Sequence, residues 1–313
     1  MKEKRAKILV IGSINMDLVL NIDRSPEAGE TVIGNEYSYI PGGKGANQAV
    51  AAARIGAQVT FCGRVGDDDN GRILLENLKN NSVDTTYVIK DSSTQTGLAV
   101  IPVESNGENR IIVMPGANMK VCEADVDKAL EKDYDAVMLQ LEIPLNVVYY
   151  AAKKASRKGI SVVLDAGPAM SIDLKSLKGL DILSPNESET FALTGIKPDS
   201  EESMVNAAKI LQDESGAEFI VIKIGKRGAM LYNDGEYKIY PTFEDVKPVD
   251  TTAAGDSFTA AMTAKAITGG DIEKAIKYAH AVGSICVSRK GAQPSLPFAG
   301  EVEDFLSKRG ILL

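Results

Sequence analysis

The sequence predicts an α/β fold: a central, mostly parallel, doubly wound sheet flanked by helices, with a small discontinuous β-sheet as a lid. Two observations lead to this prediction. Short β-branched runs alternate with helical patterns through most of the 313 residues, and such alternation is typical of a parallel sheet with helices on both faces. Two internal stretches break the alternation, because they hold several strand-like segments with no helix between them.

Six short apolar runs are predicted as buried strands of the main sheet. They cover residues 7–14, 58–62, 136–141, 161–165, 181–183 and 219–224. Residues 146–157 and 201–214 are predicted helices, and the first ends in a Lys- and Arg-rich turn before Gly159, which is a common stop signal. The chain is predicted to become helical after residue 250, near residues 253–270, 271–290 and 301–310.

The two β-rich stretches are residues 18–40, which contain DLVLNI and ETVIGNEYSYI, and residues 96–114, which contain TGLAVIPVE and NRIIVMP. Both are internal, so a second small β unit must be assembled from separate pieces of chain. We therefore expect one domain over residues 1–313, with lid segments at about 15–40 and 96–114 inserted in it.

Composition and charge exclude several classes of protein. Hydrophobic residues make up 44% and charged residues 25%, which are globular values. The net charge of −8 argues against a nucleic-acid or anionic-membrane partner, because both need a basic surface. No stretch approaches the ~20 apolar residues of a membrane span, and the N-terminal apolar run is broken by Gly12, Ser13 and Asn15, unlike a signal peptide. A cytoplasmic protein is expected.

The three cysteines predict neither a disulfide framework nor a zinc site. They are Cys62, Cys122 and Cys286, with no CxxC spacing, and the expected state is a reduced thiol in or near the core.

A Gly-rich turn opens a helix of small residues in PGGKGANQAVAAARIGA, residues 41–57. Neither GxxxxGK[ST] nor GxGxxG is present, which disfavours a P-loop or dinucleotide-binding protein. Glycines 42, 43 and 45 let the backbone approach a ligand, and the amide of Asn47 both donates and accepts, which suits a polyol. Asn15 and Asp17 follow the first strand, at the edge of the sheet where open α/β folds bind ligands. A plain turn is the alternative interpretation for these polar residues.

The segment VDTTAAGDSFTAA, residues 249–261, leads directly into a helix. Backbone N–H groups at such a helix start, around Ala253, Ala254 and Gly255, form an anion site without any basic side chain. Asp256 then has two interpretations, as a helix cap or as a general base that takes the proton of an attacking hydroxyl beside this anion hole.

Seven motifs together resemble the ribokinase family of phosphofructokinase-B type carbohydrate kinases. They occur in the family's order over nearly the whole chain: GSINMD (12–17), GGKGANQAVAAARIGA (42–57), MLQLEIPL (138–145), SPNESE (184–189), KIGKRGA (223–229), VDTTAAGDSF (249–258) and RKGAQPS (289–295). The resemblance implies a ribokinase-like fold and a kinase that uses ATP and Mg²⁺, with K⁺ as a monovalent activator.

The resemblance also implies roles for individual residues. The sugar hydroxyls would be bound by Asn15, Asp17, Gly43, Lys44, Gly45, Asn47, Glu142 and Asp256. Catalysis would fall to Asp256 with the backbone of Ala253, Ala254 and Gly255. The nucleotide and its magnesium would be held by Asn186, Glu189, Lys223, Gly225, Lys226, Arg227, Gly228, Gly255 and His280. The monovalent cation site would be formed by Asp250, Thr252, Cys286, Arg289, Gly291 and Ser295.

Some of these residues also have simpler interpretations. Glu142 could be a surface carboxylate at a strand end, and Asn186 and Glu189 form the cap and capping-box pair of a helix start. His280, the single histidine of the chain, could be a packed core residue.

The implied reaction is ATP-dependent phosphorylation of D-ribose at O5, which gives D-ribose 5-phosphate and ADP. The GGKGANQ motif together with Asn15 and Asp17 favours ribose. A related kinase for 2-deoxyribose, a ketohexose or adenosine is the alternative, followed by a sugar-binding regulator without catalysis. The family's lids often pair between subunits, so a homodimer is expected.

Overall fold

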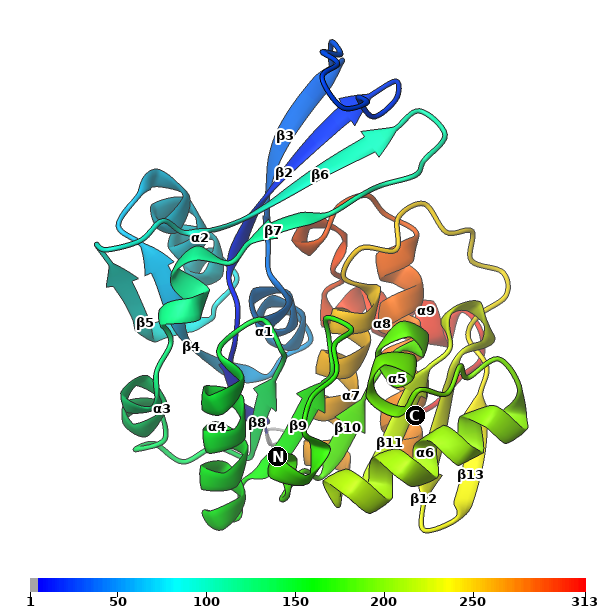
Figure 1. Cartoon of the computed structure of the whole chain (residues 1–313). Coiled ribbons are helices and arrows are strands. Elements are labelled where there is room, and N and C mark those ends of the chain that lie inside the picture. The colour runs from blue at the N-terminus through cyan, green and yellow to red at the C-terminus, as the bar shows by residue number, and fades with distance from the viewer. Residues whose placement is uncertain (1–4) are drawn as a thin grey trace.

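A computed structural model describes residues 5–313 of the chain, and residues 1–4 of the expected domain lie outside the described residues. A nine-stranded sheet crosses the body of the molecule (Figure 1). In sheet order its strands are β13 (Glu236–Tyr240), β12 (Ala229–Asn233), β11 (Phe219–Lys223), β10 (Ile182–Ser184), β9 (Ser161–Asp165), β8 (Ala136–Leu139), β1 (Lys7–Ile11), β4 (Gln58–Gly66) and β5 (Asp84–Asp91). Pairing is parallel from β5 to β11, and only β12 and β13 pair antiparallel.

Helices cover both faces of this sheet (Figure 1). One face packs against α1 (Lys44–Arg54), α2 (Asp69–Asn80), α7 (Ala254–Gly269), α8 (Ile272–Val287) and α9 (Ala299–Ser307). The other face packs against α3 (Glu123–Ala129), α4 (Leu145–Arg157), α5 (Glu187–Thr194) and α6 (Glu201–Ser215). Residues of β1 alternate between the two cores, with Ile8 and Val10 on the first and Leu9 and Ile11 on the second, as the two-residue period of a strand requires. The predicted fold class is confirmed.

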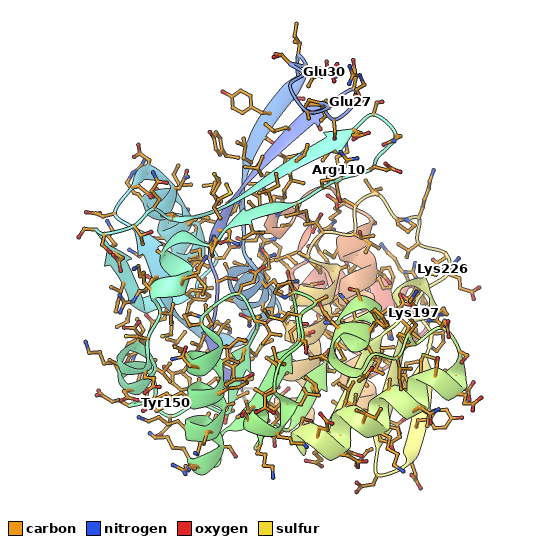
Figure 2. All side chains as sticks on the ribbon, in the orientation of Figure 1. Glu27, Glu30, Arg110, Tyr150, Lys197 and Lys226 are labelled. Atoms are coloured by element: carbon orange, nitrogen blue, oxygen red, sulfur yellow. The ribbon has the colours of Figure 1, made fainter. Side chains whose placement is uncertain are left out.

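A separate four-stranded sheet projects from the body, above the carboxyl ends of the main strands (Figure 1). Its order is β3 (Glu36–Gly42), β2 (Asn15–Ile22), β6 (Gly97–Glu104) and β7 (Ile112–Met114). The loop that joins β2 to β3 carries Glu27 and Glu30 at the far tip, and Arg110 lies near the tip of the neighbouring pair of strands (Figure 2). We call this second sheet the small sheet.

Three predicted strands end earlier than expected. The strand predicted at 219–224 ends at Lys223, and two others end before residues that form part of the site. The first stops at Ile11 and not at residue 14, and the third stops at Leu139 and not at residue 141. Three strands were not predicted. The half-buried edge strand β5 carries little apolar periodicity. The strands β12 and β13 form a hairpin whose turn has positive φ at Asp234 and Gly235. An Asp-Gly pair is a hairpin signal that can be read from the sequence.

None of the helices within residues 5–313 is long and apolar enough to cross a membrane.

Candidate active site

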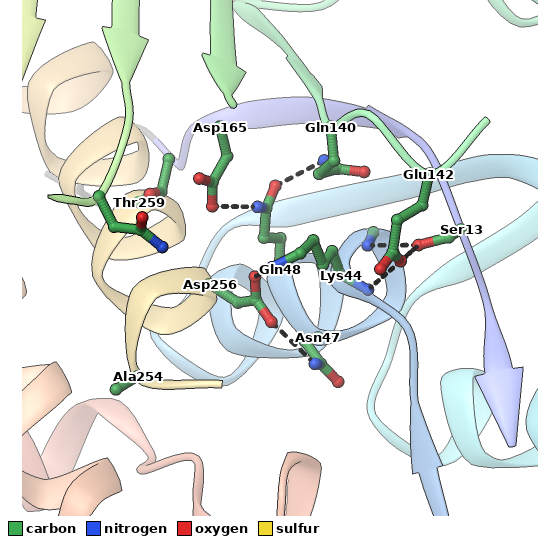
Figure 3. A network of polar contacts seen from close by, with 12 residues as sticks. Ser13, Lys44, Asn47, Gln48, Gln140, Glu142, Asp165, Ala254, Asp256 and Thr259 are labelled. Atoms are coloured by element: carbon green, nitrogen blue, oxygen red, sulfur yellow. Dashed lines mark hydrogen bonds and ion pairs between the residues drawn. The ribbon is translucent and has the colours of Figure 1, made fainter. Parts of the chain in front are cut away.

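The carboxyl ends of the central strands meet the first turns of α1 and α7 (Figure 3), and two adjoining cavities open there. The first has a volume of about 500 Å³ and is lined by Lys44, Asp165, Asn186, Glu187, Ser188, Glu189, Lys223, Gly225, Thr251, Ala253, Gly255 and Asp256. The second, of about 750 Å³, shares Lys223, Gly225, Thr251 and Gly255 with the first. Most of the residues predicted from the motifs therefore come together at one edge of the sheet.

The start of α1 depends on Gly43, which has φ of +86°. A Cβ at this position would lie 2.7 Å from the amide nitrogen of Asn15 and 2.9 Å from the Cα of Ile14. Glycine is thus required both by conformation and by space. This tight contact joins the turn at the start of α1, which precedes Lys44, to the base of the small sheet.

Asn47 and Asp256 face each other across the two helix starts. The Nδ2 atom of Asn47 donates to Oδ2 of Asp256 at 2.8 Å, and its Oδ1 atom is buried with no hydrogen-bond partner among the described residues. Buried amide oxygens are normally paired. The unpaired oxygen therefore indicates a ligand that donates a hydrogen bond at this point, as a sugar hydroxyl does.

Asp256 is not the cap of α7. Ala253 holds the capping position with φ of 59°, and Asp256 lies within the first turn. The helix-cap interpretation is therefore wrong. Burial raises the pKa of Asp256 although the ammonium of Lys44, whose Nζ lies 4.0 Å from Oδ1, opposes this shift. A carboxylate with a raised pKa is a stronger base.

Lys44 is surrounded by carboxylates. Burial alone would lower its pKa, but the charges of Asp256, Asp165, Glu142 and Glu189 raise the pKa above its usual value. Lys44 is therefore a permanent cation beside Asp256, suited to bind an anionic group.

Asn15 and Asp17 lie at the base of the small sheet and are both buried. The Oδ1 atom of Asn15 accepts from Nδ2 of Asn118 at 2.6 Å, and Asn118 also accepts from the amide of Ile14. Burial raises the pKa of Asp17 to about 7, and the charges of Glu142 and Asp256 contribute to the rise. Asn118 was not predicted, because its role depends on contacts about a hundred residues away.

Glu142 is not a surface carboxylate. Its Oε2 atom accepts from Oγ of Ser13 at 2.5 Å and from the amide of Lys44 at 3.2 Å. Glu142 thus fixes the loop after β1 to the first turn of α1, near enough to Asp17 for its charge to raise the pKa of that residue.

The predicted anion hole differs in one detail from the expectation. The amide of Ala254 already donates to the carbonyl of Thr251 at 3.2 Å, whereas Gly255, the next residue in the first turn, has no acceptor within the helix. A Cβ at Gly255 would lie 3.7 Å from Nζ of Lys223. Gly255 and the ammonium of Lys223 are therefore neighbours at the first turn of α7.

Asn186 and Glu189 form a capping box at the start of α5, as one interpretation predicted. Oδ1 of Asn186 accepts from the amide of Glu189 at 2.9 Å, and Oε2 of Glu189 accepts from the amide of Asn186 at 2.7 Å. Both residues also line the first cavity, so the cap and a contact with a ligand are compatible.

The second cavity is more apolar. Its walls include Phe258, which ends the motif at 249–258, and Phe243, Val246, Pro248 and Val287, which lie outside the motifs. The motif residues Gly225, Lys226, Arg227 and Gly228 line it too. An apolar slot next to a cavity lined by Lys44 and Lys223 suits a planar base whose phosphates extend toward these cations.

His280 lies in the wall of this second cavity. It is 7% exposed, and its ring packs at 5.1 Å against that of Phe258. Burial lowers the pKa of His280 to about 4, so the ring is neutral near pH 7. Its Nε2 atom has no partner within the part of the chain that the structure describes, which is consistent with a contact to a bound base or ribose.

The six residues predicted for a cation site come together beside α7. The carboxylate of Asp250 accepts from the amide and hydroxyl of Thr252 and from the amide of Gly291. The thiol of Cys286 lies 3.0 Å from Oγ of Ser295, and Arg289 pairs with Glu301. These contacts leave backbone carbonyls, and not the sulfur, as the donors that a hard cation would use.

Comparisons with known proteins agree with this geometry. A family model described as pfkB family carbohydrate kinase matches residues 5–299. The ribokinase of Bacillus subtilis is 40% identical over 302 residues, which cover 96% of this chain and 99% of the relative. The deoxyribokinase of Salmonella typhi is 36% identical over 303 residues, which cover 96% and 98% of the two chains.

The fold has an equally extensive match. The structure of Arabidopsis thaliana ribokinase in complex with ribose and ATP superposes with a TM-score of 0.88 at 34% identity, over 97% of this chain and 99% of that one.

Proposed function

The chain belongs to the pfkB family of carbohydrate kinases, and from this premise we propose that it transfers the terminal phosphoryl group of ATP to O5 of D-ribose. The observation that carries the proposal is the position of Asp256. Its buried carboxylate stands in the first turn of α7 and accepts from Asn47, which has an unpaired amide oxygen. Gly255 in the same turn and the neighbouring Lys223 offer donors to a phosphoryl group. The similarity to a ribokinase whose structure holds ribose and ATP supports the choice of substrates.

The mechanism follows from these positions. Asp256 accepts the proton of the O5 hydroxyl, while Asn47 and Lys44 hold the carboxylate in place. The amide of Gly255 and the ammonium of Lys223 stabilise charge on the transferred group. Proton transfer is late in a loose phosphoryl-transfer transition state, so positioning contributes more than basicity. The small sheet would close over the sugar and exclude water, which protects bound ATP from hydrolysis.

The remaining predicted site residues are assigned either to the sugar or to the nucleotide. We assign Asn15, Asp17, Gly43, Gly45, Asn47 and Glu142 to the hydroxyls, because their contacts join the base of the small sheet and the start of α1 to Lys44 and Asp256. These six residues adjoin the first cavity through Lys44 and Asp256 but are not part of its wall. Lys226, Arg227, Gly228 and His280 are assigned to the nucleotide. A cytoplasmic location agrees with the use of ATP.

Magnesium and potassium are part of the proposal. No group of three or more His, Cys, Asp or Glu side chains that could hold a metal occurs within residues 5–313, so Mg²⁺ would be held mainly by the ATP phosphates and by water near Asn186 and Glu189. It would neutralise phosphate charge. We propose that K⁺ binds near the carbonyls of the segments joined by Asp250, close to the first turn of α7.

A homodimer is proposed through the small sheet. Cross-strand partners share a face, and the register places Tyr39, Leu18, Val100 and Ile112 in one row. Tyr39 is 57% exposed and Ile112 is 59% exposed. Asp17 lies on the opposite face, toward the site, so this apolar row is available to a second copy.

The decisive experiment measures ADP release from purified protein with MgATP and potassium. Parallel reactions contain no sugar, D-ribose, 2-deoxyribose, D-fructose or adenosine. We expect release that depends on ribose. Release with 2-deoxyribose instead would keep the mechanism and transfer the assignment to the substrate of the similar deoxyribokinase, whereas no release with any acceptor would favour a sugar-binding regulator.

The role of Asp256 is tested in the same assay with Asp256→Asn, which keeps the size and the hydrogen bond but removes the base. We expect kcat to fall by about a thousandfold or more, with ribose binding retained in calorimetry. Near-normal turnover in this variant would refute the assignment of the base.

A further inference from the structure

A row of hydrogen-bonded side chains connects Gln140, Gln48 and Asp165 (Figure 3) and ends at Lys223. Nε2 of Gln140 donates to Oε1 of Gln48 at 2.6 Å, and Nε2 of Gln48 donates to Oδ2 of Asp165 at 2.8 Å. The other oxygen of Asp165, Oδ1, pairs with Nζ of Lys223 at 2.6 Å. Gln48 and Gln140 are fully buried, and Asp165 is 2% exposed. Gln48 and Gln140 lie within two of the motifs, but neither they nor Asp165 had been assigned a role from the sequence.

The direction of the hydrogen bonds in this row of side chains is fixed by the carboxylate of Asp165. An ionised carboxylate only accepts hydrogen bonds, so the amide nitrogen of Gln48 must face Asp165 and its oxygen must face Gln140. The nitrogen of Gln140 is then committed to Gln48. Its Oε1 atom is left buried without a hydrogen-bond partner among the described residues. An unpaired buried oxygen costs free energy, so the order is imposed from the Asp165 end.

The row of hydrogen-bonded side chains ends at Lys223, whose ammonium lies near the first turn of α7. Nζ of Lys223 lies 3.4 Å from Oγ1 of Thr259 on α7, and it would be 3.7 Å from a Cβ at Gly255. The ammonium therefore sits beside the first turn of α7. An unconstrained lysine has a flexible stem, but this one is 12% exposed and anchored by a single carboxylate oxygen.

We infer that Gln48 is a positioning residue for phosphoryl transfer: by holding Oδ2 of Asp165, it turns Oδ1 toward Lys223 and fixes the ammonium beside Gly255. The inference rests on the proposed kinase function. Gln48 touches no substrate in this role and acts only through Asp165 and Lys223. Small displacements of a group that contacts the transferred phosphoryl lower the rate strongly, so the effect of Gln48 should appear in turnover.

The first test compares Gln48→Glu with Gln48→Met. At low pH a protonated Glu side chain donates to Asp165 and still accepts from Gln140, so the row of hydrogen bonds is preserved. As the pH rises from about 6 to about 9 this acid ionises and repels Asp165, and kcat should fall relative to the wild type. Gln48→Met should instead lower kcat about tenfold at every pH, which is the effect of one lost hydrogen bond to a charged group.

A second test asks whether Gln48 acts through Lys223. In the Lys223→Met background the positioned group is absent, so adding Gln48→Met should lower kcat no further. Multiplicative losses in the double variant, or a Gln48→Glu profile that coincides with the wild-type profile, would overturn the inference.

Two controls distinguish lost positioning from lost stability and from a failure of catalysis itself. Asp125→Asn breaks a similarly buried ion pair with Arg64, 2.8 Å long and outside the cavities, and should lower Tm without changing the pH profile.

Binding of the β,γ-imido analogue of ATP needs no acceptor sugar. If no acceptor is turned over, the proposed function fails, and the inference is tested by the binding of the ATP analogue alone. Gln48→Met should weaken analogue binding in the wild-type background. In the Lys223→Met background, adding Gln48→Met should leave analogue binding unchanged.

Discussion

At the residue scale, the site concentrates buried charge. The charges of Glu142, Asp165, Glu189 and Asp256 act on Lys44. Asp17 stands near Glu142 and Asp256, and Lys223 is a second cation, paired with Asp165. Burying so many carboxylates costs stability, because desolvation and like charges both disfavour their ionised forms. Sites that carry out chemistry commonly retain this kind of cost. The cost is largest where the pKa departs most from its usual value.

Asp17 allows this cost to be measured. Its pKa is raised from 3.8 to about 7 by burial and by neighbouring carboxylates. Between these values the folded protein keeps a proton that the unfolded chain loses, so stability falls as the pH rises and is lowest above about 7. Asp17→Asn should therefore match the wild type near pH 4 and exceed it at about pH 8, by at most about 4 kcal/mol.

Urea unfolding of both proteins without sugar, at several pH values, measures this difference. A difference in stability that does not change with pH would contradict the raised pKa of Asp17. The same substitution should weaken ribose binding, because the charged acceptor is lost.

The motifs predicted the residues that face the cavities better than those that support them. Gly43, Asn47, Glu189 and Asp256 stand in short segments with a recognisable pattern, and all lie at the site. Gln48 and Asp165 are separated by 117 residues along the chain, and their contact exists only after the sheet has formed. No local pattern encodes such a pair, which is why the supporting network required the structure.

At the element scale, boundaries were predicted less well than the elements themselves. The strand at residues 161–165 was placed correctly, since its β-branched run is buried on both faces. The strands that begin at residues 7 and 136 were predicted too long, because the apolar residues that follow them pack in the loops of the site. Apolar character therefore indicated burial there and not strand conformation.

The start of α1 gives a prediction at this scale. Gly43→Ala should destabilise the protein by several kcal/mol, because positive φ is unfavourable for alanine and its Cβ would collide with the backbone of Asn15. The ribose KM should rise too, since Lys44 and Asn47 follow directly. Gly56→Ala is the matched control: φ there is +102° but no atom lies within 4 Å of the added Cβ.

The control should cost only about 1–2 kcal/mol and leave the KM unchanged. Thermal unfolding and steady-state kinetics of the two variants check both parts. Equal destabilisation by the two substitutions would show that conformation alone, and not the close approach to Asn15, sets the requirement for glycine.

At the scale of the whole molecule, the two sheets contribute different residues to the site. The main sheet carries Asp165, Lys223 and the helix starts, whereas the small sheet carries Asn15 and Asp17 beside the turn that opens α1. The division was predictable in outline, because the two β-rich stretches interrupt a regular α/β pattern. The order of strands in the small sheet was not, since β2 pairs with β6 across more than seventy intervening residues.

The proposed dimer would form through the small sheet, so a substitution on the exposed face of that sheet tests it. Ile112→Glu places a charge in the apolar row formed by Tyr39, Leu18, Val100 and Ile112, and burying an unpaired charge in an interface is unfavourable. We expect the wild type to sediment as a dimer and Ile112→Glu as a monomer, with a raised ribose KM, because the strand that carries Asp17 loses the support of the second copy. Ile73→Glu is the control, since Ile73 is an exposed isoleucine on α2, 41% accessible and outside the small sheet. A variant at Ile112 that still sediments as a dimer would place the interface elsewhere, and a monomeric wild type with normal ribose affinity would show that the small sheet closes on the sugar without a partner.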